Sequence, residues 1–330
     1  MTVRIMITGA GGPAAIGLIS AWRTADAALF AADMDRCASG LHLVEKTNRF
    51  LIPPADAADF VDQMIALCAR LRIDLLVPTV DAELIPLAQA RHRFRANGTL
   101  LMSASLPALS QCLDKWRLVH AATGVVPVPK STLHTPRFQS RHAEGRLIVK
   151  PRHGSGGRGV ELLESSLELS RFDPSEDLLV QEFLPGEEYS VDVLRLDECH
   201  PVACVPRLRM KVDSGVAVAG RTVYDEELME LARRIAVHLG LSGIANVQFR
   251  RASDGTPHLL EINPRVPGTL PLTTASGIDM PKLWLAHVRG QQLVVPTDFL
   301  EIAMVRTWRE HFIDVASVLD LELPTLKESA

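Results

Sequence analysis

The sequence lacks the features that mark several broad classes of protein. It contains no run of about 18 apolar residues, the length that a membrane-spanning helix needs. Its N-terminus has no long apolar segment of the kind found in signal peptides. Basic residues are not in excess, because 35 Lys and Arg stand against 39 Asp and Glu and the formal net charge is −4. These absences argue against a membrane or nucleic-acid partner and predict a cytoplasmic protein.

Cysteine is also sparse, and its spacing excludes two further classes. The five cysteines are scattered and form no CxxC pair: Cys37, Cys68, Cys112, Cys199 and Cys204. An odd, dispersed set supports neither a disulfide framework nor a structural zinc site. We therefore expect reduced thiols, as in a cytoplasmic protein.

What the chain does contain is enough length for two or three packed units. With 330 residues it exceeds one small core. Its first hundred residues alternate between strand and helix patterns. The predicted strands are Val3–Thr8, Ala28–Ala32 and Ile73–Val77, and the predicted helices are Ala14–Trp22 and Ala58–Leu71. Such alternation indicates βαβ units and a parallel sheet. The pattern changes near residue 112, after which strands and helices are mixed less regularly.

A predicted hairpin between Ile244 and Asn263 carries four polar side chains. Taking Asp254-Gly255 as a two-residue loop pairs Gln248 with Glu261, Asn246 with Asn263, and Ala252 with Pro257. Opposed residues share one face of a sheet, whereas Val247, Phe249, Leu260 and Ile262 take the other. Mg²⁺ prefers oxygen ligands of this kind and completes its shell with water and phosphate. A solvated polar strand face is the alternative interpretation, because a bulge would shift the pairing.

A glycine-rich loop follows another predicted strand, Leu147–Lys150. The loop reads His153-Gly154-Ser155-Gly156-Gly157-Arg158-Gly159, without the GK[ST] of a Walker A motif. Glycines let backbone N–H groups approach phosphate oxygens, and a lysine at the strand end adds a positive charge. The loop is therefore a candidate phosphate site, although a surface loop is the simpler alternative.

Taken together, these segments resemble the ATP-grasp superfamily, especially its carbamoyl-phosphate-synthase-like and carboxylate–amine ligase members. The resemblance covers about Val3 to Val295. It is carried by LDKW at 113–116, VKPRHGSGGRGV at 149–160, VQEFLPGEEYSVDV at 180–193, NVQF at 246–249 and EINPRVPG at 261–268. It implies an α/β fold that is α+β in the ATP-grasp part. Residues 1–111 would form a Rossmann-like domain, 112–185 a small subdomain with the glycine-rich lid, and 186–330 a large subdomain with the metal site. ATP would lie between the two subdomains.

The same resemblance implies roles for individual residues. Lys115 and Lys150 look like the lysines that hold the ATP phosphates, together with the loop residues His153, Gly154, Ser155, Gly156 and Gly157. The hinge that reads adenine through backbone groups would be Gln181, Glu182, Phe183 and Leu184, with Glu182 near the exocyclic amine. Glu188 looks like the ribose-binding carboxylate, and the neighbouring Glu187 is the alternative.

Gln248, Glu261 and Asn263 resemble the magnesium ligands of the family, and Gln248 also contacts the nucleotide. Many ligases carry a second carboxylate where this chain has Gln248, so less negative charge is available for a second metal. Arg265 looks like the arginine that stabilises the transferred phosphoryl group. Arg207 is a weaker catalytic candidate, with Arg209 and Arg221 in the same stretch near the substrate.

The activity implied is that of a ligase using ATP and Mg²⁺, or Mn²⁺ in its place. It would phosphorylate a small-molecule carboxylate and couple the resulting acyl phosphate to an amine. Carboxylates do not condense with amines at neutral pH, because the oxygen leaving group is poor. Phosphorylation supplies a good leaving group, and positioning and charge neutralisation carry the step. The resemblance also implies a homodimer.

Two rival functions remain open from the sequence. One is phosphorylation of bicarbonate or carbamate, as in carbamoyl phosphate synthases. The other is a nicotinamide-dependent oxidoreductase, because Gly9, Gly11 and Ala14 match G-x-G-x-x-A after a strand and Asp33 follows at ribose-binding distance. We favour the ligase, because in the ATP-grasp family the Rossmann-like domain that precedes the ATP-grasp part normally binds no NAD. Thr79, Asp81 and Glu83 follow a predicted strand and are candidate substrate contacts. N-capping of a helix by Thr79 or Asp81 is the favoured alternative.

Overall fold

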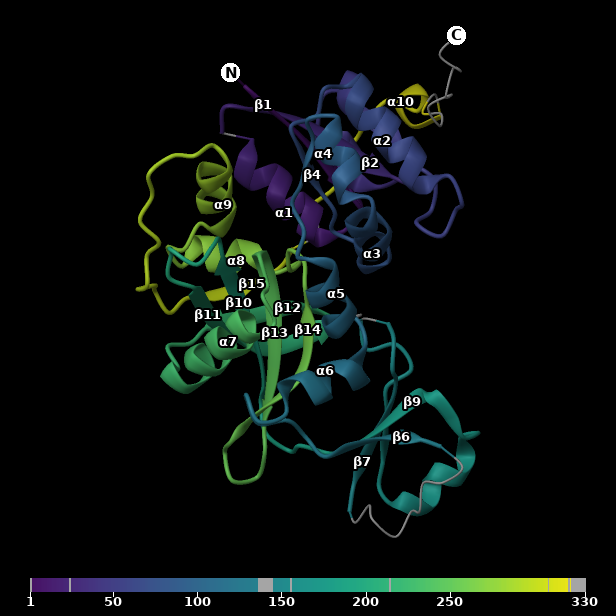
Figure 1. Ribbon diagram of the computed structural model, residues 1–330, viewed down its shortest axis with the longest axis vertical. Coiled ribbons are helices and arrows are strands. Elements are labelled where there is room, and N and C mark those ends of the chain that lie inside the picture. Colours follow the sequence, from purple (N-terminus) through teal and green to yellow (C-terminus); the bar gives the residue numbers. More distant parts are fainter. Residues whose placement is uncertain are drawn as a thin grey trace.

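A computed structural model of the protein describes residues 2–23, 25–135, 145–154, 156–213, 215–307, 309–319 and 321. The predicted site residue Ser155 lies outside them. Three sheets occupy three regions of the molecule, as Figure 1 shows. Within the described residues, no helix combines the length and the apolar character needed to cross a membrane.

The N-terminal sheet is parallel, as predicted, with strand order β3-β2-β1-β4-β5. Its strands are β1 (Val3–Thr8), β2 (Ala27–Asp33), β3 (Arg49–Leu51), β4 (Leu75–Val77) and β5 (Leu100–Leu101). Its helices are α1 (Pro13–Trp22), α2 (Phe60–Arg70), α3 (Asp81–Gln89) and α4 (Arg91–Ala96), with 3₁₀ turns η1 (Ser39–Leu43) and η2 (Lys46–Asn48). Alternate residues of β1 enter different cores, Ile5 and Ile7 on the α1 side and Met6 on the α2 side. Burial on both faces explains why the strand patterns read as continuous apolar runs.

The largest sheet is antiparallel and has the order β14-β13-β10-β11-β12-β15. Its strands are β10 (Glu188–Arg195), β11 (Ala203–Asp213), β12 (Val216–Thr222), β13 (Gly243–Arg251), β14 (Pro257–Asn263) and β15 (Ala303–Val305). One face packs against α5 (Leu106–Cys112), α6 (Lys115–Ala122) and α7 (Glu226–His238) through residues such as Val191, Val247 and Phe249. The opposite face carries the polar side chains of the candidate site. The predicted domain limits at 111 and 185 remain predictions, although α5 and α6 share this core.

The third sheet is small, antiparallel and ordered β6-β9-β7-β8. It comprises β6 (Ser131–His134), β7 (Leu147–Pro151), β8 (Glu161–Leu163) and β9 (Ser175–Glu182), with the 3₁₀ helix η4 (Ser166–Arg171). In Figure 1 it projects from the rest of the molecule at the lower right. Strand β7 delivers Lys150, and β9 ends at the predicted hinge.

The β13–β14 hairpin pairs Gln248 with Glu261 and Asn246 with Asn263, as predicted. Two details were wrong. The loop is one residue longer, since Ala252 N–H donates to Thr256 O at 2.9 Å and Pro257 pairs with Arg251. A bulge then lets Phe249 pair with Leu259, so that Leu259 is buried and Leu260 lines the cavity. Gly255, at φ +87°, suits the left-handed position of a three-residue loop.

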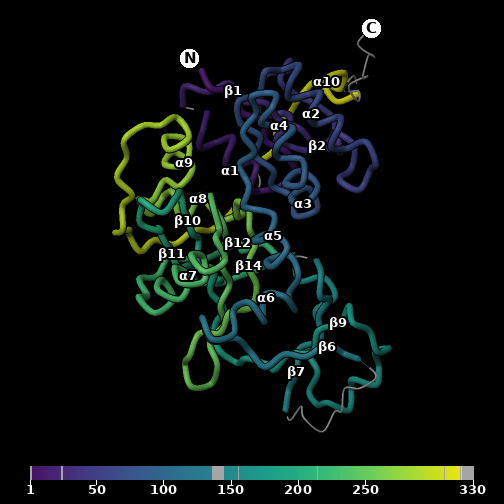
Figure 2. Tube along the Cα trace, viewed as in Figure 1, coloured from purple at the N-terminus to yellow at the C-terminus, as the bar shows by residue number. Residues whose placement is uncertain are grey.

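The C-terminal part links the large sheet back to the N-terminal unit. After α8 (Leu270–Ala275) and α9 (Met280–Val288), the chain adds β15 to the sheet edge and ends, within the described residues, near α10 (Ala316–Leu319). Both Figure 1 and Figure 2 show α10 beside the N-terminal helices. Arg36 Nη1 there donates to Leu319 O at 3.5 Å.

Candidate active site

A cavity of about 790 Å³ opens where the three regions meet. Its walls are the polar face of the large sheet, the ends of β7 and β9 with the glycine-rich loop, and the turns that follow β1 and β4. Most of the predicted site residues line it. Gly154, Gly156 and Gly157 are among them, whereas exposed His153 turns its Nδ1 toward Leu113 O at 3.4 Å.

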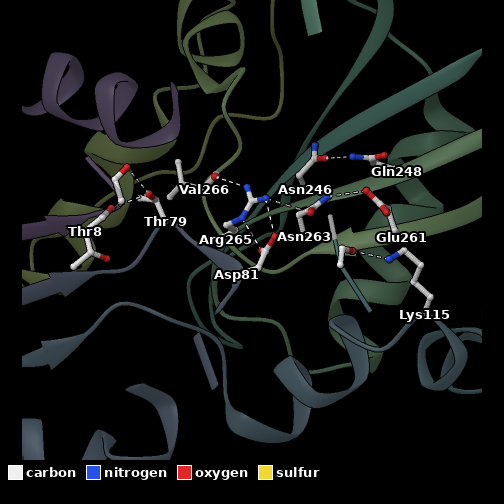
Figure 3. Close-up of polar contacts among 12 residues, drawn as sticks. Thr8, Thr79, Asp81, Lys115, Asn246, Gln248, Glu261, Asn263, Arg265 and Val266 are labelled. Carbon is white, nitrogen blue, oxygen red and sulfur yellow. Dashed lines mark hydrogen bonds and ion pairs between the residues drawn. The ribbon is translucent and has the colours of Figure 1, made fainter. Parts of the chain in front are cut away.

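The three predicted metal ligands lie on adjacent strands and point to the cavity. Asn263 Nδ2 donates to Glu261 Oε1 at 3.3 Å, and Gln248 pairs across the hairpin with Glu261. Figure 3 shows Asn263 and Glu261 side by side, Gln248 next to Glu261 on the neighbouring strand, and Lys115 on the other side of Glu261. Gln248, Glu261 and Asn263 are called the metal row below. One carboxylate and two amide oxygens therefore converge, which is a donor set suited to Mg²⁺.

Arg209 holds both Gln248 and Glu188. Its Nη1 donates to Gln248 Oε1 at 3.1 Å and to Glu188 Oε1. Its Nη2 donates to Gly215 O at 3.0 Å, in the β11–β12 hairpin. The Gln248 oxygen predicted to bind metal thus already accepts a hydrogen bond. The sequence interpretation treated Arg209 only as a weak substrate contact.

Glu188 lines the cavity and Glu187 does not. The Glu187 carboxylate instead accepts a hydrogen bond from Tyr189 Oη at 2.8 Å. Alternation along β10 explains the difference, because neighbouring residues point to opposite sheet faces. Of the two candidates for ribose binding, Glu188 is therefore the one on the cavity side.

The two predicted phosphate-binding lysines are both buried, Lys150 at 7% and Lys115 at 8% exposure. Lys150 Nζ donates to Gln181 Oε1 at 3.0 Å, and Lys115 Nζ donates to Gly154 O at 2.6 Å. Burial lowers the pKa of Lys150 to about 8, although nearby Glu261 raises it. The pKa of Lys115 is also lowered by burial, against the opposing effect of Glu261. Both ammonium groups therefore lack the compensation that a bound anion would give.

A clamp between β7 and α6 fixes these lysines relative to each other. Arg152 donates from Nε and Nη2 to the two oxygens of Asp114, at 2.9 and 2.7 Å. Asp114 also caps α6 by accepting from the backbone N–H groups of Trp116 and Arg117. The clamp places Lys115, one residue after Asp114, beside the glycine-rich loop. Sequence reasoning missed it, although a capping Asp before a helix is a readable signal.

The predicted hinge joins the small sheet to β10. Gln181, Glu182, Phe183 and Leu184 all line the cavity. Glu182 Oε1 accepts from Lys130 N at 2.8 Å, so its carboxylate secures the neighbouring strand. The guanidinium of Arg146 lies over the ring of Phe183, with Arg146 Cζ 4.2 Å from the ring centre. Backbone groups of this segment remain the candidates for base recognition.

The two predicted catalytic arginines occupy different positions. Arg265 lines the cavity and forms a double hydrogen bond with Asp81. Arg207 is only 2% exposed, contacts Asp192 and Thr269, and is not among the cavity-lining residues. Asp192 also accepts from Asn246 and Thr273, at 2.9 and 2.6 Å. Arg207 therefore supports the floor of the site, and direct contact with a substrate stays a prediction. Arg221 is exposed on β12 and does not line the cavity either.

Arg306 is a functional candidate that the sequence interpretation missed. It follows β15, and its Nη2 donates to Gly268 O, next to the cavity. Burial lowers its pKa, and the charge of Arg207 lowers it further. The Nε atoms of Arg207 and Arg306 are both buried without a hydrogen-bond partner among the described residues. No local pattern marks Arg306, because its neighbours in space come from distant segments.

The N-terminal end of the cavity is formed by the turns after β1 and β4. Gly11 N–H donates to Asp33 Oδ2 at 2.8 Å, and Thr79 Oγ1 donates to Thr8 O at 2.8 Å. Glu83 is buried behind this wall, where it accepts from Thr8 Oγ1, and burial raises its pKa to about 7. A Cβ on Gly9 would lie 2.4 Å from Val80 Cγ2. Packing between the two turns thus accounts for this glycine without a dinucleotide.

Comparison with known proteins adds to this geometry. A family described as "ATP-grasp in the biosynthetic pathway with Ter operon" matches residues 174–310. A family described as "PylC-like, N-terminal domain" matches residues 5–102. The carbamoyl phosphate synthase large chain of Thermoanaerobacter sp. (strain X514) is 28% identical over 166 residues. That match covers 44% of this chain and 15% of the relative, so the relative is a much longer protein.

Solved structures share the fold at low sequence identity. The biotin carboxylase domain of Hydrogenobacter thermophilus 2-oxoglutarate carboxylase has a TM-score of 0.73 at 15% identity, covering 90% of this chain and 72% of that one. N5-carboxyaminoimidazole synthetase from Staphylococcus aureus has a TM-score of 0.71 at 14% sequence identity, and the match covers 93% of this chain and 83% of that one. L-amino acid ligase from Bacillus licheniformis has a TM-score of 0.69 at 15% sequence identity, and the match covers 87% of this chain and 74% of that one.

These matches confirm the predicted resemblance to the ATP-grasp superfamily. The similarity to the PylC-like N-terminal family lies in residues 5–102, and the similarity to the ATP-grasp family lies in residues 174–310.

Proposed function

We propose that the protein is an ATP-dependent carboxylate–amine ligase using Mg²⁺. The observation that carries the proposal is the placement of two buried lysines and an oxygen-rich row of side chains on the same cavity. Lys150 is 7% exposed, and the side chain to which its Nζ donates is the uncharged amide of Gln181. A buried ammonium group without an anionic partner is costly, and a nucleotide phosphate would supply that partner.

The residues present fit both magnesium and ATP. Gln248, Glu261 and Asn263 offer the amide and carboxylate oxygens that Mg²⁺ binds, and the remaining positions suit phosphate oxygens and water. Related solved structures hold ADP or its magnesium salt. When bound, Mg-ATP supplies the phosphoryl group that turns a carboxylate into a reactive acyl phosphate.

The protein's own residues would then position and neutralise charge. Lys115 and Lys150 would bind phosphate oxygens, and Arg265 would face the phosphoryl group during transfer. The glycine-rich loop would exclude water, which protects the acyl phosphate from hydrolysis. An amine then attacks the acyl carbon, the C–O bond to phosphate breaks, and an amide and phosphate are released. The amine loses one proton in this step.

The acceptor substrates would enter from the N-terminal end. This part of the cavity is lined by Gly9, Gly11, Asp33, Val80 and Gly268. We propose a small-molecule carboxylate and a small-molecule amine here. The structural relatives include a biotin carboxylase domain, an N5-carboxyaminoimidazole synthetase and an L-amino acid ligase, so the fold alone does not identify the acid.

The test is substrate-dependent turnover. Purified protein is incubated with Mg-ATP and pools of carboxylic acids and amines, and ADP and phosphate release is measured. Release that requires both an acid and an amine supports the ligase. Arg93→Ala, at an exposed ion pair remote from the cavity, serves as a control for general effects of substitution.

One alternative has an observation in its favour. Gln248 stands where many ligases carry a carboxylate, and the chain is 28% identical to a carbamoyl phosphate synthase over the matched part. Phosphorylation of bicarbonate or carbamate is therefore the second candidate. In the same assay, ADP release with bicarbonate alone would favour it over the ligase.

A further inference from the structure

Arg265 is held by a residue from a different part of the molecule. It follows β14 in the large sheet, whereas Asp81 is the first residue of α3 in the N-terminal unit. Arg265 Nε donates to Asp81 Oδ1 at 2.7 Å, and Nη2 donates to Asp81 Oδ2 at 3.1 Å. Figure 3 shows this double contact crossing from one unit to the other. Two parallel hydrogen bonds fix the plane of a guanidinium as well as its position.

The contact leaves one edge of Arg265 directed at the cavity. Asp81 occupies the edge formed by Nε and Nη2. The opposite edge makes only long contacts, from Nη1 to Val266 O at 3.4 Å and from Nη2 to Asn263 Oδ1 at 3.5 Å. Arg265 lines the cavity, whereas Asp81 is not among the lining residues. Asp81 therefore lies behind the guanidinium, and a substrate carboxylate need not displace it.

Asp81 is itself fixed to the N-terminal sheet. Val80, its neighbour, packs so closely on the turn after β1 that a Cβ on Gly9 would lie 2.4 Å from Val80 Cγ2. Thr79 Oγ1 donates to Thr8 O at 2.8 Å. Val80 lines the acceptor end of the cavity, and Asp81 follows it directly. One short turn thus connects the wall of the acceptor end to the arginine.

We propose that Asp81 is a positioning residue that orients Arg265 toward the phosphoryl group, so that the N-terminal unit completes the transfer site. The inference rests on the proposed function, because it takes the phosphoryl group to lie beside Arg265. It adds a defined task for the N-terminal unit. A residue that acts through Arg265 should affect the transfer geometry and leave ground-state nucleotide binding unchanged.

The test compares two probes that need no knowledge of the acceptor. Mg-ADP alone reports nucleotide binding, and Mg-ADP with aluminium fluoride reports binding of a mimic of the transferred phosphoryl group. Asp81→Ala should weaken the fluoroaluminate complex about 100-fold and change Mg-ADP affinity by less than about twofold. Asp81→Asn, which keeps the shape and loses the charge, should give about a tenfold loss, and Asp81→Glu should restore part of it.

A double-mutant cycle separates positioning from general stability. If Asp81 acts through Arg265, then Asp81→Ala should have no further effect in an Arg265→Ala background. Asp62→Ala is the matched control, since it removes another Arg–Asp pair, an exposed one, from the same unit. Additive losses, or an unchanged fluoroaluminate affinity in Asp81→Ala, would overturn the inference. A parallel loss of Mg-ADP binding and thermal stability would assign Asp81 a structural role instead. Failure of the unaltered protein to bind Mg-ADP would reject the proposed function itself.

Discussion

The chain has two glycine-rich segments, and they use glycine for opposite reasons. In the turn after β1, a side chain on Gly9 would collide with Val80, and one on Gly11 would crowd Ala38 at 3.2 Å. In the loop of residues 153–159, a Cβ on Gly154 or Gly157 would meet nothing within 4 Å. The first segment is packed against protein, whereas Gly154 and Gly157 of the second line the open cavity. Gly159, at the end of that loop, is packed, because a Cβ there would lie 2.9 Å from Pro151 Cγ. Similar composition therefore encodes a rigid wall in one place and room for a ligand in the other.

The largest expected effect is on turnover and concerns Glu261, on the polar sheet face that lines the cavity. Glu261→Ala removes the only carboxylate of the predicted metal row, and turnover should fall about 1,000-fold, because charge at the phosphates is no longer neutralised. Circular dichroism and the melting temperature should stay near those of the unaltered protein. Retained turnover would refute the metal assignment.

Substitution in the packed turn after β1 should lower the free energy of unfolding. Gly9→Ala combines a positive φ of +64° with the clash against Val80, so we expect a loss of about 3 kcal/mol in the free energy of unfolding. The melting temperature should fall by at least roughly 5 °C. A variant that melts like the unaltered protein would show that the turn is not packed as described.

A pH titration sharpens the role of Lys150. Its pKa of about 8 in the folded protein lies below the ordinary value of 10.5, because burial disfavours the charged form. Affinity for Mg-ADP should therefore fall about tenfold per pH unit above pH 8, as the neutral amine replaces the ammonium group. Between these two pKa values the unfolded chain binds the extra proton, so the stability of the ligand-free protein should rise with pH.

Calorimetric titration with Mg-ADP from pH 7 to 9.5 measures the affinity. Lys150→Arg is the matched variant, because a guanidinium keeps its charge across this range. An unaltered protein whose affinity is flat with pH, or a Lys150→Arg variant with the same decline, would contradict the assignment.

The smallest effect is expected at Gly157. Gly157→Ala meets no neighbour, and only the left-handed φ of +70° penalises it, by about 1 kcal/mol. Its melting temperature should drop far less than that of Gly9→Ala in the same differential scanning experiment. Equal losses for the two variants would erase the distinction between packed and open glycines.

The hairpin that carries the metal row shows how far local patterns reach. Alternation and the Asp254-Gly255 turn predicted the pairs Gln248–Glu261 and Asn246–Asn263, which the structure has. These pairs were predicted correctly because two differences between the predicted and the observed hairpin cancel. The longer loop shifts the pairing by one residue near the turn, and the bulge at Leu260 shifts it back. Neither departure follows from hydrophobic periodicity, since a bulge depends on how the strand packs.

Contacts between distant segments were beyond sequence reasoning. Asp81 and Arg265 are separated by 184 positions, and Arg306 meets Gly268 from the C-terminal part. No spacing rule connects such pairs, whereas Lys150 and the glycine-rich loop are contiguous and readable. The parallel N-terminal sheet was likewise predictable, because its strands and helices alternate along the chain. Whether a given glycine was packed or open depended on neighbours such as Val80 and could not be inferred locally.

The buried carboxylate of Asp192 restricts which substitutions can be tolerated during evolution. Arg207, Asn246 and Thr273 all donate to it, in a place without access to water. Loss of any one donor leaves the others facing an under-compensated charge, so single replacements are penalised. Related chains should therefore either retain this quartet whole or exchange it together for an apolar cluster, and intermediates between the two should be rare.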